Sequence, residues 1–100
     1  MAESAEIERI ARDVVNAHTV MNAVTSVISR PSVDWTDDPI IEINVVVRPE
    51  AETALLKGET PLNILTRISD QLIGLGEHRF PIIHYATTAD MEAVNDASEP

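Results

Sequence analysis

The stretch Ile40-Ile41-Glu42-Ile43-Asn44-Val45-Val46-Val47-Arg48 decides the fold, because it is the clearest strand in the sequence. Successive side chains of a strand point to opposite faces of its sheet. One face of this strand is wholly apolar and consists of Ile41, Ile43, Val45 and Val47. The opposite face is mixed and consists of Ile40, Glu42, Asn44 and Val46. Such a pair of faces predicts a sheet that helices cover on one side.

Upstream of this strand, apolar residues at helical spacing predict an amphipathic helix over residues 5–22. The segment from Val24 to Ser29 is β-branched and alternating, which favours a short strand, while a continuation of the helix is the competing interpretation. Pro31 forces Arg30 toward extended geometry, so no helix is expected to continue past it. The composition of residues 31–39 predicts a loop.

Downstream, residues 51–56 are expected to form one helical turn. Thr60-Pro61 then opens a second long helix, with Thr as N-cap and Pro at the first helical position. Gly74 or Gly76 is expected to end it in a left-handed cap. The apolar face of this helix is predicted to be Leu62, Leu65, Ile68, Leu72 and Leu75. A third strand is predicted over residues 80–87, with Pro81 suited to its start or to a sheet edge.

These elements predict an α+β fold of order α-β-β-α-β, with a small three-stranded mixed sheet and two helices packed on one face. Residues 1–88 are expected to form a single domain, and residues 89–100 an acidic, partly disordered C-terminal tail. The core is predicted to contain Ile10, Val14, Ile41, Ile43, Val45, Leu65, Ile68 and Leu72. A sheet of this size leaves exposed edges and a half-apolar second face, so homodimerisation is expected.

The formal net charge of −10 argues against binding to phosphate backbones and to anionic membrane surfaces. The element order is similar to KH-type RNA-binding folds in topology alone. Those folds need a Gly-x-x-Gly loop and a basic groove, whereas Gly74-Leu75-Gly76 has another spacing in an acidic chain. An acid-rich start is unlike a signal peptide, and no apolar run reaches membrane-spanning length, so a cytoplasmic location is expected.

The segment around the sole tryptophan is the most unusual in the chain. Asp34, Asp37 and Asp38 surround Trp35 just before the central strand. One interpretation is a partner-binding loop with Trp35 as its anchor and the acids as its rim. A divalent-cation site is a second, although the segment lacks the turning glycine that such loops use. The third is structural: Trp35 packs back onto the core while the aspartates cap and turn the chain.

An alternative site lies on the open face of the sheet. Its polar groups would be Glu42, Asn44, Arg79 and His84, with Glu42 as the carboxylate partner of a histidine that acts as acid or base. The structural interpretation is that Arg79 pairs with a surface acid and that His84 is a solvated or hydrogen-bonded sheet residue.

Motifs for catalysis are missing from the sequence. With no cysteine there is no thiolate nucleophile, disulfide or Cys-based zinc site, and no glycine-rich phosphate loop or nucleophile elbow occurs. No metal, cofactor or catalytic residue is therefore assigned. The leading hypothesis is a non-catalytic interaction or regulatory accessory protein, antitoxin-like in character, that forms a homodimer or binds a more basic protein. The rival hypothesis is a small enzyme or ligand-binding domain with its site on the open sheet face.

Overall fold

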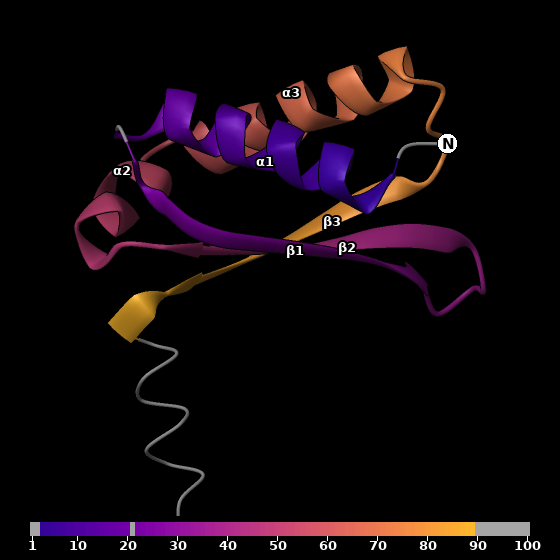
Figure 1. Cartoon of the computed structure of the whole chain (residues 1–100), viewed down its shortest axis with the longest axis horizontal. Helices are drawn as coiled ribbons and strands as arrows, with labels where there is room; N and C mark the ends of the chain where they lie inside the picture. Colours follow the sequence, from indigo (N-terminus) through magenta and orange to yellow (C-terminus); the bar gives the residue numbers. More distant parts are fainter. Residues whose placement is uncertain (1–2, 21, 90–100) are drawn as a thin grey trace, which may run out of the picture.

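A computed structural model shows a three-stranded mixed sheet with helices on one face (Figure 1). It describes residues 3–20 and 22–89. The elements in chain order are α1 (Ser4–His18), β1 (Val24–Val33), β2 (Pro39–Val47), the 3₁₀ turn η1 (Pro49–Ala51), α2 (Glu52–Leu55), α3 (Thr60–Gly74) and β3 (Phe80–Thr87). The predicted α+β class, the α-β-β-α-β order and the short helical turn after the central strand are confirmed.

β2 lies at the centre of the sheet, with β1 antiparallel on one side and β3 parallel on the other. Its predicted apolar face, from Ile41 to Val47 at every second residue, is at most 1% exposed. α1 and α3 cover that face, and the opposite face stays uncovered (Figure 1). The predicted alternation of β2 is therefore what orients the sheet beneath the helices.

β1 is a strand, as favoured, but it runs four residues further than predicted and passes through Pro31 to Val33. The prediction that residues 31–39 form a loop is therefore wrong, and the connection shrinks to residues 34–38. Pro31 stands opposite Ile41 in an edge strand. A proline is tolerated there because its missing N–H faces no neighbouring strand.

α1 ends at His18, four residues before its predicted end. Thr19 caps it by donating its hydroxyl to the Val15 carbonyl at 2.7 Å, and Asn22 takes a left-handed φ of 58°. The N–H of Val24 then donates to the side-chain oxygen of Asn16 at 3.0 Å, which fixes the entry into β1. The chain must reverse here to bring β1 beneath α1, so the helical periodicity cannot continue.

α3 buries a different stripe from the predicted one. Its buried residues are Ile64, Ile68 and Leu72, spaced four apart. Leu65, predicted to be in the core, is only half-buried, and Leu62 and Leu75 are 59% and 42% exposed. The helix is turned toward α1, so the flank that faces β3 has little cover. The other residues predicted in the core are buried: Ile10, Val14, Ile41, Ile43, Val45, Ile68 and Leu72.

The C-terminus of α3 has the predicted glycine cap. Gly76 takes a φ of 81° and donates its N–H to the Ile73 carbonyl, while the N–H of Glu77 donates to the Leu72 carbonyl. This pair of bonds is a Schellman motif. It directs the chain from α3 straight toward β3.

The acidic tail predicted at residues 89–100 lies outside the described residues apart from Ala89. In the part of the chain that the structure does describe, no helix has the length and hydrophobicity needed to span a bilayer.

Candidate functional site

The hairpin tip between β1 and β2, residues 34–38, carries the tryptophan and the three aspartates. The N–H of Asp34 donates to the Asp38 carbonyl at 3.0 Å, and the N–H of Asp37 donates to the Asp34 carbonyl at 3.0 Å. Asp37 takes a left-handed φ of 66°, a conformation that aspartate tolerates better than most residues. This is a tight three-residue hairpin loop, with Trp35 and Thr36 at its turn. The backbone of the tip is therefore fixed by the strands on either side.

The carboxylate of Asp34 organises the same tip from inside. Its Oδ1 atom accepts hydrogen bonds from the Thr36 hydroxyl at 2.6 Å, the Thr36 N–H at 2.8 Å and the Asp38 N–H at 3.0 Å. The hydrogen bond from the Thr36 hydroxyl is the main cause that lowers the pKa of Asp34 below its ordinary value, and the two backbone bonds add to it. The tip is thus held by a carboxylate that stays ionised across the physiological range.

Trp35 stands out from this tip with 94% of its surface exposed. The interpretation that Trp35 packs back onto the core is therefore wrong, although Asp34 does turn the chain as that interpretation expected. Asp37 and Asp38 are exposed beside the indole. The structure brings all four predicted residues of the loop together in one rigid, outward-facing hairpin tip, which we call the Trp35 hairpin (residues 34–38).

Acid is expected to loosen the Trp35 hairpin. Asp34 has a lowered pKa in the folded chain, so its stabilising bonds are intact above the ordinary value of 3.8 and are lost as the pH falls through the lower, folded value. Fluorescence of Trp35, the sole tryptophan, should therefore show a transition with a midpoint below pH 3.8. Asp34→Asn should remove this transition and Asp37→Asn should keep it. A midpoint at or above 3.8 in the unsubstituted chain would contradict the assignment.

The metal interpretation of the Trp35 hairpin gains no support. Within residues 3–20 and 22–89, no three histidine, aspartate or glutamate side chains come together as a group that could hold a metal ion.

Three of the four residues of the alternative site do meet on the open sheet face. Asn44 and His84 stand opposite each other in the β2–β3 register. His84 Nε2 lies 3.6 Å from Glu42 Oε1, and Arg30 Nε of β1 lies 3.6 Å from Glu42 Oε2. Both outer partners are more than half exposed, so water screens these ion pairs. The cluster could hold a small polar ligand, but its geometry is also that of an ordinary surface ion-pair row.

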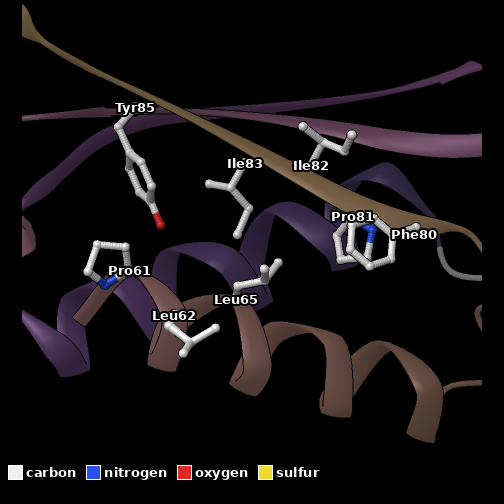
Figure 2. A pocket seen from close by; sticks show the side chains of 8 residues that line it. All are labelled: Pro61, Leu62, Leu65, Phe80, Pro81, Ile82, Ile83 and Tyr85. Atoms are coloured by element: carbon white, nitrogen blue, oxygen red, sulfur yellow. The ribbon is translucent and has the colours of Figure 1, made fainter. Parts of the chain in front are cut away.

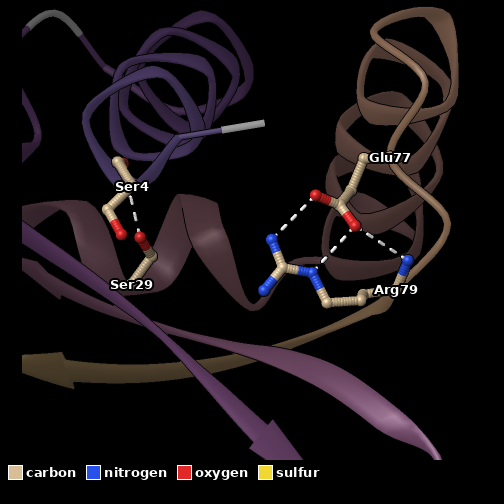
Figure 3. Close-up of polar contacts among 4 residues, drawn as sticks. All are labelled: Ser4, Ser29, Glu77 and Arg79. Carbon is tan, nitrogen blue, oxygen red and sulfur yellow. Dashed lines mark hydrogen bonds and ion pairs between the residues drawn. The ribbon is translucent and has the colours of Figure 1, made fainter. Parts of the chain in front are cut away.

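Arg79, the fourth residue, does not join this cluster, because it binds Glu77 instead (Figure 3). Its Nε and Nη2 atoms each donate to one oxygen of the Glu77 carboxylate at 2.8 Å, and its backbone N–H donates at 3.0 Å. Glu77 is 3% exposed, so the partner of Arg79 is a buried acid rather than the expected surface one. This clip of two side-chain bonds lies within the connection between α3 and β3 and fixes its conformation.

Sequence reasoning missed two residues that build these sites. Thr36 holds Asp34, and the spacing Asp34-x-Thr36 is the signal that could have found it, because aspartate commonly binds the backbone two residues on. Arg30 takes the place predicted for Arg79 beside Glu42. The contact between Arg30 and Glu42 could be predicted only once β1 was known to extend past Ser29, because the register between β1 and β2 then sets Arg30 opposite Glu42.

Comparisons of the chain with protein-family models, with curated proteins and with solved structures find no match.

Proposed function

We propose that the chain is a non-catalytic interaction protein that binds a basic protein partner through the Trp35 hairpin. The observation that carries the proposal is the 94% exposure of Trp35 on a tip whose conformation is already fixed. Trp is the side chain with most to gain from burial, and it is enriched at the energetic centres of protein interfaces.

The fixed conformation of the Trp35 hairpin supports a role in binding a partner. A flexible loop would lose conformational freedom when a partner orders it, and that loss subtracts from affinity. Here the backbone bonds between Asp34 and Asp38 and the three bonds to the Asp34 carboxylate already fix the tip. Binding would therefore bury the indole at a small cost in entropy.

The charge around Trp35 defines the chemistry of the partner. Asp34, Asp37 and Asp38 place three carboxylates within the hairpin, and the chain as a whole carries −10. A surface rich in arginine or lysine would be attracted to this field, and an arginine could stack on the indole face. The partner is accordingly a basic protein surface with an apolar pocket, and a regulatory or antitoxin-like accessory role follows from such a pairing.

Trp35→Ala combined with Asp37→Asn should weaken association with the basic partner about thirtyfold, since a tryptophan hot spot contributes about 2 kcal/mol. Thermal unfolding should not change, because both side chains are exposed. The measurement is quantitative capture with the tagged chain, from cells that produce it natively, followed by mass spectrometry.

The matched control for this experiment is Leu56→Ala, which truncates a residue that is 60% exposed at the end of α2, far from the hairpin (Figure 1). Leu56→Ala should capture the basic protein as well as the unsubstituted chain does. If the double variant captures the same proteins in the same amounts, the Trp35 hairpin is not the binding surface.

A further inference from the structure

A second candidate binding surface lies between α3 and β3. It is a groove of about 380 Å³ lined by Pro61, Leu62 and Leu65 of α3 and by Phe80, Pro81, Ile82, Ile83 and Tyr85 of β3 (Figure 2). We call it the α3–β3 groove. A second hollow of about 430 Å³ continues it past Ser69 and Ile73 and shares Phe80 and Pro81 with it. The two together follow the length of α3.

The surface along the α3–β3 groove is apolar and exposed. Leu62 is 59%, Ile73 68% and Phe80 59% exposed, and none of the eight lining residues of the groove carries a charge. The charged residues of α3 lie elsewhere on the helix: Arg67, for example, faces α1 beside Asp13 and His18. Glu77, His78 and Arg79 border the second hollow, so the uncharged surface is the eight-residue groove itself. In a chain with 24% charged residues, such a groove is a feature to be explained.

The two edges of the sheet differ in how they are protected. On β1, Pro31 offers no N–H, the N–H of Ser29 donates to the Glu8 carboxylate at 2.8 Å, and Arg30 adds a charge. The Ser29 hydroxyl also donates to the Ser4 carbonyl at 3.3 Å (Figure 3). β3 has β2 on one side, no described strand on the other, and a proline only at its start. An edge of this kind is a template for pairing with another strand.

Among the eight lining residues of the groove, only Tyr85 has a polar side-chain atom. The ring of Tyr85 reaches from β3 toward Pro61 (Figure 2). Its hydroxyl oxygen is buried and has no hydrogen-bond partner among the described residues. Burial also raises the pKa of Tyr85 to about 12. The single chain already encloses this oxygen, so the groove presents an apolar wall to an incoming chain.

We propose that a second copy of this chain docks on the α3–β3 groove, with β3 pairing antiparallel to β3 of its partner across a two-fold axis. Charge is compatible with this occupant at the groove, because two copies that each carry −10 repel each other least where neither presents charge. Antiparallel pairing centred on Ile83 sets residues of the same face opposite each other. The result is a continuous six-stranded sheet with the helices of both copies on one face.

The test is the molar mass of the full chain by light scattering over a range of concentrations. The unsubstituted chain should give twice 11.0 kDa. Leu62→Glu combined with Ile73→Glu should raise the dissociation constant of the dimer at least about a hundredfold, because the added carboxylates would be buried against each other. Both residues are exposed in the single chain, so the circular dichroism of the variant should stay that of the folded chain. Its thermal unfolding should lose the dependence on concentration that dimerisation gives the unsubstituted chain.

The matched control is Ile28→Glu combined with Val33→Glu, which adds the same two charges at residues that are 61% and 57% exposed on β1, the opposite edge of the sheet. This variant should remain a dimer. A mass of 11.0 kDa at every concentration would overturn the proposal, and so would a double variant that stays dimeric. Neither result bears on the Trp35 hairpin, because no substitution in this test touches it.

Discussion

Arg79→Ala is expected to lower the free energy of unfolding by about 3 to 5 kcal/mol. The substitution leaves the Glu77 carboxylate buried at 3% exposure without the guanidinium that donates two hydrogen bonds of 2.8 Å to it. It also releases the clip between the end of α3 and the start of β3. Because typical domains are stable by about 5 to 15 kcal/mol, urea denaturation followed by circular dichroism should show the loss clearly.

Two further variants separate the loss of the bonds between Arg79 and Glu77 from the general effect of removing an arginine. Arg67→Ala removes an exposed arginine from α3 and should change stability by less than about 0.5 kcal/mol. Glu77→Leu combined with Arg79→Met should recover much of the loss, because replacing both members of a buried pair by apolar residues is often neutral. If Arg79→Ala proved as mild as Arg67→Ala, the clip would not be a stabilising element.

Ile43→Ala is expected to cost about 2 to 5 kcal/mol of the free energy of unfolding. Ile43 is fully buried at the centre of β2, under the helices and between β1 and β3. Truncation there leaves a cavity that the surrounding elements fill only in part. The measurement is again urea denaturation.

The control on the same sheet is Ile28→Ala. Ile28 is 61% exposed on the open face, so its truncation should stay within about 0.5 kcal/mol of the unsubstituted chain. Equal losses for Ile43→Ala and Ile28→Ala would contradict the assignment of the two faces of the sheet.

Local patterns in the sequence were sufficient for β2 and β3, and they favoured a strand for β1 while leaving a continuation of α1 open. The alternation around Ile43 identified the buried face of β2, and glycine chemistry identified the cap at Gly76. Local patterns could not predict where β1 ends, because a strand can pass through Pro31 only if it lies at the edge of the sheet. The rotation of α3 about its own axis, which buries Ile64 in place of Leu65, depends on where α1 lies. No local pattern in the sequence of α3 indicates it.

The sequence indicated which residues make up the candidate site, but not how their side chains are arranged. The clustering of three aspartates around Trp35 singled out the segment, yet composition alone allowed the indole to lie outside or to pack inward. The structure places the indole outside, on a short hairpin whose length followed from the unpredicted end of β1 at Val33. Arg79 was misplaced for a similar reason, since its partner Glu77 is buried by the cap of α3 rather than by any pattern of its own.

The central claim is that a basic protein partner covers Trp35. It is tested most directly by hydroxyl-radical footprinting of the chain, alone and in the captured complex, with the modification of each residue quantified by mass spectrometry. The claim predicts that the modification rate of Trp35 falls several-fold in the complex while that of Leu56, exposed just after α2, stays unchanged. A Trp35 that is modified as fast in the complex as in the isolated chain would contradict it.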